Sequence, residues 1–124
     1  MQLTKNFTLA EFACKDGTAV PPRFYSNVTR LAQNLQNLRD YIGTAVVITG
    51  SGYRTAIHNK KVKGALHSQH LTASAADINV KGYTPDQLAV IIEKLISKGV
   101  MAEGGIGIYK TFLHYDIRGV KVRW

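Results

Sequence analysis

The stretch SQHLTASAAD, residues 68–77, places His70 and Asp77 seven positions apart. It begins as a polar turn and continues into a β-prone segment, and a second β-prone segment contributes the sequence HYD, residues 114–116. Two imidazoles and one carboxylate are ligands that catalytic zinc favours, with a fourth position left open for water. The pattern therefore predicts a small zinc hydrolase whose fold brings the two segments together.

Length and composition indicate one globular domain spanning residues 1–124. The chain is 45% hydrophobic and 19% charged, and at 124 residues it can bury a core without disulfides or a structural metal. Cys14 is its only cysteine, which excludes an internal disulfide and predicts no cysteine-based zinc site. A catalytic zinc must then be held by histidine, aspartate or glutamate.

The chain is strongly basic, with 16 Lys and Arg against 8 Asp and Glu and a net charge of +8. Such a charge attracts polyanions, among them nucleic acid, anionic membranes and bacterial wall polymers. Apart from the run KKVK, residues 60–63, the basic residues are scattered, and no base-stacking platform or recognition helix accompanies them. We therefore expect no nucleic-acid partner.

No segment has the apolar length of a signal peptide or a membrane span. We expect cytoplasmic synthesis without a signal peptide, no membrane insertion and a monomeric protein. An action on the cell wall would then require release by other means.

Hydrophobic spacing and capping signals predict a mixture of helices and strands. Capping boxes at 8–11 and 84–87 start two of the helices, and glycines at 43 and 99 end two. The class is α+β, a small and mostly antiparallel sheet flanked by helices. The expected helices are 9–13, 26–42, 55–62 and from 84 to Gly99, and the expected strands are 45–49, 75–80, 106–109, 112–117 and 120–124, the last three forming an antiparallel meander.

Strand alternation places Asp77 opposite the apolar side chains of its own strand, on a face that we expect to be open. On the later strand, His114 and Asp116 share one face. Pairing of the two strands would bring Asp77 within metal-sharing distance of His114, with His70 arriving from the preceding turn.

The stretch HLTASAAD, residues 70–77, resembles the His-x-x-Gly-x-Ala-x-Asp signature of the M15 zinc peptidases. That family includes D-alanyl-D-alanine carboxypeptidases and phage L-alanyl-D-glutamate endolysins, and the resemblance to its compact single-domain subgroup extends over almost the whole chain. It implies zinc held by His70, Asp77 and His114, in a fold similar to that shared by hedgehog proteins and D-Ala-D-Ala peptidases. The further matching stretches are FTLAEF (7–12), SGYR (51–54), SQH (68–70), GGIG (104–107), FLHYD (112–116), RG (118–119) and RW (123–124).

The sequence departs from the family pattern at the glycine of the signature and at the general base. Ala73 replaces the glycine, which could shift the turn. Many relatives carry an acid three residues before the last histidine ligand or a histidine two before it, and here these places hold Thr111 and Phe112. Asp116 is the nearest acid, and it could be the base or could orient His114 through the other ring nitrogen. Glu103 is a poorer candidate for the base.

Arg54 follows a predicted strand in a glycine-rich turn, from which a guanidinium can reach a cleft. Such a group suits a peptide carboxylate or a developing oxyanion, and the resemblance implies this role, although an ordinary surface arginine is the alternative. Ser68 could bind substrate or cap its turn, and Tyr109 could line the cleft or pack. His58 is expected in a solvated helix, and His67 is left out of the ligand set because the family pattern uses His70.

We expect from these features a zinc metallopeptidase that cuts the peptide stems of bacterial peptidoglycan, of endolysin or carboxypeptidase type. Its partner would be a peptidoglycan peptide, and its setting phage lysis or host wall turnover. The alternative is a non-catalytic zinc-binding interaction module of the same fold, suggested by the missing acid at Thr111.

Overall fold

Five short strands form one sheet in the computed structural model, which describes residues 1–124. The strand order is β1-β2-β4-β3-β5, and every pairing is antiparallel except that of β3 with β5. The predicted α+β class with a mostly antiparallel sheet is therefore confirmed. The strands are β1 (Val46–Ile48), β2 (Ala75–Val80), β3 (Gly105–Ile108), β4 (Leu113–Asp116) and β5 (Val122–Arg123).

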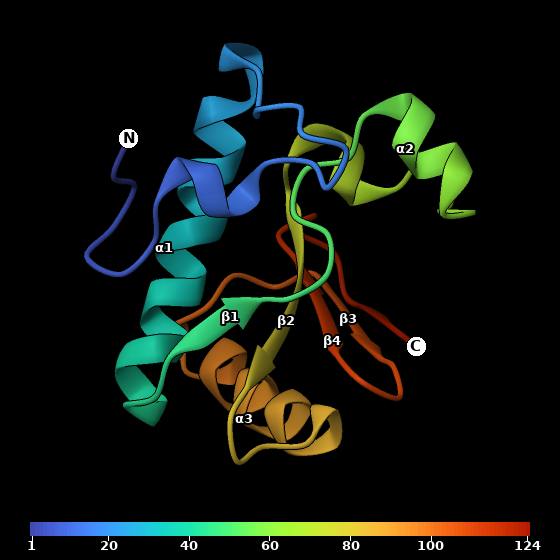
Figure 1. Cartoon of the computed structure of the whole chain (residues 1–124). Helices are drawn as coiled ribbons and strands as arrows, with labels where there is room; N and C mark the ends of the chain where they lie inside the picture. The colour runs from blue at the N-terminus through green and yellow to red at the C-terminus, as the bar shows by residue number, and fades with distance from the viewer.

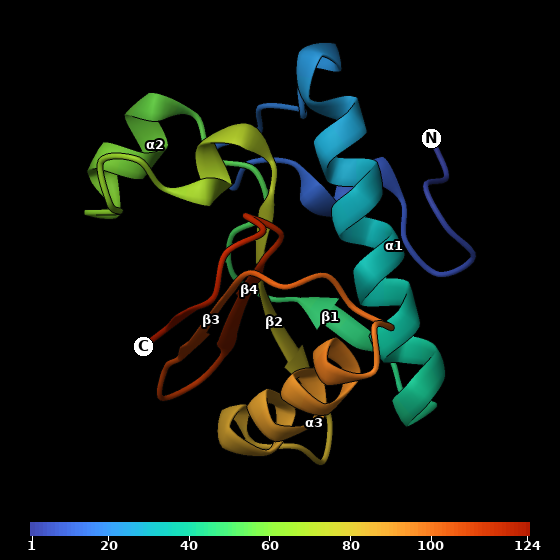
Figure 2. The same cartoon turned by 180° about the vertical axis from the view of Figure 1, so that it is seen from behind.

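Three α-helices and three short 3-10 helices complete the fold. The long α1 and α3 pack with the sheet, whereas α2 lies at the other end of the molecule from α3 and across from α1 (Figures 1 and 2). No helix is both long and apolar enough to cross a lipid bilayer. The helices are α1 (Tyr25–Ile42), α2 (Ala56–Lys61), α3 (Pro85–Ser97), η1 (Leu9–Phe12), η2 (Pro22–Phe24) and η3 (Gln69–Thr72).

The hydrophobic core lies on one face of the sheet because side chains alternate along each strand. Ile78 of β2 and Leu113 of β4 are completely buried there, together with the apolar stripes of α1 and α3. The opposite face of the same two strands carries Asp77, His114 and Asp116. The alternation thus separates a core face from a polar face, as the sequence predicts.

Helix ends follow the local signals. Thr84 caps α3 through a reciprocal hydrogen-bonded box with Gln87, and Gly43 ends α1 in the left-handed conformation with φ of 70°. The helix predicted at 9–13 is a single 3-10 turn over Leu9–Phe12, because the backbone leaves the helical conformation at Ala13, where ψ is 150°.

The antiparallel meander predicted at the C-terminus is confirmed for β3 and β4 but is wrong for the last strand. The chain turns after β4 and returns beside β3, so that β5 pairs in parallel with β3, with Gly105 opposite Val122. Backbone hydrogen bonds between Ile106, Ile108 and Trp124 extend this pairing to the last residue. The return places Trp124 next to the polar face of the sheet.

Replacing Gly43 with alanine should lower the free energy of unfolding by about 1 kcal/mol, because an L side chain is strained at positive φ. A Cβ there would meet no atom within 4 Å, so the loss would report backbone strain alone. Gly43→Asn, which tolerates this conformation better, should lose less. Urea denaturation of the three proteins measures both effects, and a fully stable Gly43→Ala would contradict the assigned helix end.

Candidate metal centre

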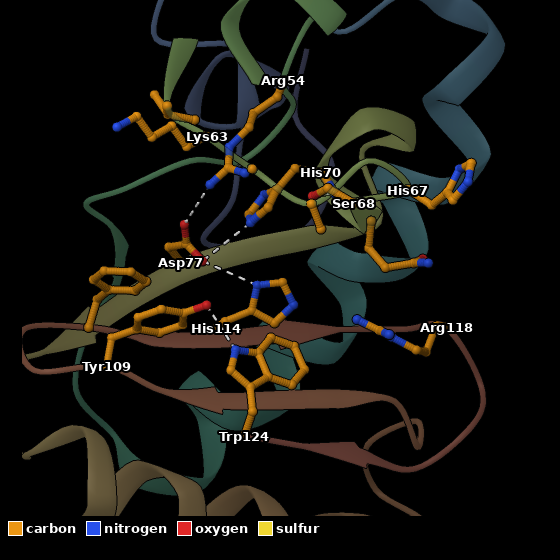
Figure 3. Close-up of a pocket in the computed structure, with 15 residues that line it drawn as sticks. Arg54, Lys63, His67, Ser68, His70, Asp77, Tyr109, His114, Arg118 and Trp124 are labelled. Atoms are coloured by element: carbon orange, nitrogen blue, oxygen red, sulfur yellow. Dashed lines mark hydrogen bonds and ion pairs between the residues drawn. The ribbon is translucent and has the colours of Figure 1, made fainter. Parts of the chain in front are cut away.

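The register of β2 against β4 places Asp77 directly opposite His114. The Asp77 Oδ1 atom lies 3.3 Å from His114 Nδ1 and 3.3 Å from His70 Nε2 (Figure 3). One potential ligand atom from each of the three side chains lies within 4.8 Å of the other two. All three residues are buried, Asp77 to 4% exposure, which corrects the expectation of an open face. Gly50 packs against the Asp77 side chain, and the guanidinium of Arg54 lies beside the carboxylate.

The orientation of His70 is fixed by the turn that carries it. Ser68 caps η3 by accepting a hydrogen bond from the backbone N–H of His70, and the ring Nδ1 lies 2.7 Å from the carbonyl oxygen of Gly52. If Nδ1 donates to that carbonyl, Nε2 presents its lone pair to Asp77. Ala73 ends the turn at φ of 57°, the left-handed conformation that explains why glycine is preferred in the corresponding signature position.

The orientation of His114 is fixed by Asp116, two residues along β4 on the same face. The ring Nε2 lies 2.7 Å from Asp116 Oδ2, so that Nδ1 faces Asp77. Asp116 is fully buried, and its oxygens also accept from the guanidinium and backbone of Arg118 and from the backbone N–H of Gly105. A side chain on Gly105 would collide with this carboxylate. The geometry favours the orienting role of Asp116 over the proton-accepting one.

Charge compensation holds both carboxylates ionised. Burial by itself raises the pKa of Asp77, but the contacts with the His114 and His70 imidazoles, whose ring nitrogens lie 3.3 Å away, outweigh it and hold the pKa below its usual range. Burial likewise opposes ionisation of Asp116, whose pKa is lowered by His114 and Arg118. The pKa of His114 is raised despite burial, because both carboxylates contact its ring. The site where these side chains meet therefore favours a bound cation.

These residues fit a divalent metal ion. Two imidazole nitrogens and a carboxylate oxygen converge, and the remote nitrogen of each ring has a carbonyl or carboxylate partner, as in metal-ligating histidines generally. His58 and His67 do not belong to this group.

A pocket of about 370 Å³ opens onto the three side chains. Its wall includes the cations Arg54, Lys63 and Arg118, whereas Asp77 is its only carboxylate. Asp116 and Glu103 do not line it, and Glu103 is paired instead with Arg123 at 2.7 Å. The pocket is thus positively charged around the ligand group.

The guanidinium of Arg54 is anchored on the rim of this pocket. Its Nε donates to Ser51 Oγ at 2.8 Å, one terminal nitrogen donates to the Asn59 amide oxygen at 3.2 Å, and the other lies 3.6 Å from Asp77 Oδ2. Asn59 is a buried residue of α2. The arginine is therefore positioned beside the ligand group and does not behave as an ordinary surface residue.

An aromatic wall closes the side of the pocket opposite Arg54 (Figure 3). The rings of Tyr109 and Phe112 stack at 4.4 Å, and the Trp124 ring lies 4.9 Å from that of His114. Trp124 occupies the space that a side chain at Gly107 would fill, since a Cβ there would lie 2.5 Å from the indole ring.

The structure brings together the residues for which the sequence suggested a site role, except Glu103, which lies outside the pocket and pairs with Arg123. His70, Asp77 and His114 form the ligand group, and Arg54, Ser68 and Tyr109 line the pocket, while Asp116 lies behind His114. Sequence reasoning missed Lys63, Arg118 and Trp124 as pocket residues. Arg118 and Trp124 lie in the family-matching stretches RG and RW, and Arg118 also follows Asp116 at the two-residue period of a strand.

Comparison with known protein families matches residues 5–116 to the family described as Peptidase M15. Comparisons with the curated proteins and with the solved structures gave no match.

Asp116→Asn should weaken metal binding by roughly 10–100-fold, because a neutral amide accepts the hydrogen bond of the His114 ring more weakly than a carboxylate does and orients the ring less firmly. Competition with a chelating indicator measures the affinity, and excess metal should restore any lost activity. Asp86→Asn, an exposed change in the first turn of α3, is the control and should bind metal normally. Normal metal affinity combined with a large loss of rate would instead assign Asp116 the role of base.

Proposed function

Because this chain belongs to the peptidase M15 family, we propose that it is a zinc metallopeptidase that hydrolyses the peptide stems of bacterial peptidoglycan. The family supports a peptidase-type function, and its members are generally metal-dependent. The observation that carries the proposal is the group of His70, Asp77 and His114 at the base of a positively charged pocket.

His70 Nε2, His114 Nδ1 and a carboxylate oxygen of Asp77 would hold the zinc ion. Zinc bound by three protein ligands supplies a Lewis acid and lowers the pKa of a bound water. Gly52 and Asp116 hold the two rings in place from behind, so the ligand atoms are positioned before any ion arrives. This preorganisation supports a catalytic site, since the core of the fold is complete without the ion.

Arg54 is placed to bind the negative charge of the substrate or of the tetrahedral intermediate. Two of its nitrogens donate to Ser51 and Asn59, and the remaining terminal nitrogen points toward Asp77 at the base of the pocket. A fixed, charged donor in a partly buried site stabilises a carboxylate or oxyanion without reorganising. The same arginine could serve the terminal carboxylate in a carboxypeptidase or the scissile carbonyl in an endolysin.

Tyr109 would contribute a hydrogen-bond donor on the opposite wall. The indole Nε1–H of Trp124 can only donate, so the Tyr109 hydroxyl accepts that bond at 2.8 Å and keeps its own O–H for another acceptor. A peptide carbonyl lying between the two walls would receive it. Ser68 has one oxygen lone pair engaged as the cap of η3, and its hydroxyl can also face substrate.

The charge of the pocket supports a carboxylate-bearing peptide as substrate. Arg54, Lys63 and Arg118 surround the ligand group, and the whole chain carries a net charge of +8. Peptidoglycan stems carry free carboxylates on a polyanionic wall, which such a field attracts. We propose that the protein acts as a monomer on the wall after release, by phage lysis or another export route.

A non-catalytic metal-binding module is the second candidate. One observation favours it: Asp77, itself a ligand, is the only carboxylate that lines the pocket, so no second acid is placed to accept a proton from water. Incubation of the purified protein with defined muropeptides, followed by mass spectrometry of the products, separates the candidates. New stem fragments that disappear with a chelator support the peptidase and identify the bond cut, whereas intact muropeptides at full zinc loading support the module.

Chelation should abolish turnover and leave the far-ultraviolet circular dichroism spectrum unchanged. The reason is that a cluster of 25 buried hydrophobic residues, rather than the metal, holds the fold. Added zinc should restore the activity. Loss of the helical spectrum on chelation would contradict a purely catalytic role for this metal.

Arg54→Ala should lower kcat by about 10²–10³-fold, the usual effect of removing one donor to an oxyanion. Zinc content, measured on the same samples, should remain near that of the wild type. Arg30→Ala removes an equal charge from an exposed site on α1 and should keep the wild-type rate. An Arg54→Ala protein with unchanged kcat would exclude this role of the arginine.

A further inference from the structure

Outside the pocket, a second group of potential metal ligands is assembled by the fold. One ligand atom from each of Cys14, Asp16 and His58 lies within 4.8 Å of the other two. Cys14 and Asp16 belong to the loop that follows η1, whereas His58 lies on α2. Residues this far apart in the chain meet only because the loop packs against the start of α2.

We propose that Cys14, Asp16 and His58 form a second binding site, specific for a zinc-like divalent cation. Thiolate, imidazole and carboxylate are all zinc ligands, with bonds of about 2.0–2.3 Å. Because the three ligand atoms lie within 4.8 Å of one another, small side-chain shifts would let them share one ion. Binding displaces the thiol proton of Cys14, and water completes the coordination on the exposed side of Asp16. The sequence predicted no cysteine-based site because neither partner is a cysteine.

Two ligands of this site are already held in place. Asp16 Oδ1 accepts the backbone N–H of Thr18 at 2.9 Å, and Oδ2 accepts the hydroxyl of Thr55 at 2.8 Å. The loop is closed by backbone hydrogen bonds between Cys14 and Thr18 and between Gly17 and Cys14, both 2.9 Å. Cys14 is 3% exposed and packs against the hydrophobic core. Hydrogen-bonded ligating carboxylates of this kind are typical of metal sites.

An ion at this site would stabilise one wall of the pocket that opens onto His70, Asp77 and His114. His58 adjoins Asn59, the residue of α2 that accepts a hydrogen bond from Arg54 and also donates to the Ala65 carbonyl. Coordination of His58 would therefore join the N-terminal loop to the helix that holds Arg54. The ion would position α2 and, through Asn59, Arg54. This proposal does not depend on the proposed peptidase activity.

Cobalt binding tests the site because Co²⁺ bound to a thiolate gives a near-ultraviolet charge-transfer band that imidazole and carboxylate ligands do not give. The ligand group at His70, Asp77 and His114 contains no sulfur, and Cys14 is the only cysteine, so the band reports this site alone. The metal-free full chain, kept reduced with a phosphine, is titrated with Co²⁺. We expect two ions per chain and the charge-transfer band, whereas one ion without the band would overturn the proposal.

Variants assign the band to the three side chains. Cys14→Ser should lose the band and one ion, and His58→Gln and Asp16→Asn should each weaken the band-forming step by at least about 10-fold. His70→Ala should keep the band while losing the other ion, and His67→Gln, an exposed histidine in neither group, should keep both. A band that forms with unchanged Co²⁺ affinity in both His58→Gln and Asp16→Asn would overturn the three-ligand site. Those two variants decide the question even if Cys14→Ser does not fold.

Discussion

The antiparallel register of β2 on β4 is the constraint on which the metal centre depends. It sets Asp77 opposite His114 while Ile78 faces Leu113 in the core. A slip of one residue would turn Asp77 into the core and expose Ile78, so the same hydrophobic alternation that stabilises the sheet also fixes the ligand geometry. Stability and function are thus specified by a single choice of register.

Burial of two carboxylates beside the core is tolerated because each one is matched by fixed donors. Asp116 accepts from Arg118, Gly105 and His114, so its charge is neutralised within the sheet and its oxygens have no capacity left for the pocket. Removing one partner of such a buried network leaves an uncompensated charge, which is far more costly than removing a surface ion pair. This network explains how a short, four-residue strand can hold His114 rigidly.

Much of the fold and the ligand set could be predicted from the sequence. Three- and four-residue apolar steps gave α1, and the capping box with Pro85 gave α3, because both signals are local. The parallel pairing of β5 could not be predicted, since a two-residue strand carries no periodicity and its partner is set by the path of the turn after Asp116. The same long-range return hid the part that Trp124 plays in the pocket.

The metal centre is held in place largely by backbone and side-chain groups that are not themselves metal ligands. The Gly52 carbonyl fixes His70, Asn59 of α2 fixes Arg54, and the absence of a side chain at Gly107 admits the indole that covers His114. Each partner lies outside the element that carries the group it positions, although Asn59 is only five residues from Arg54 in the sequence. Small displacements of α2 or of the C-terminus should therefore alter the pocket without touching a metal ligand, because catalytic groups need their supporting contacts held to a fraction of an ångström.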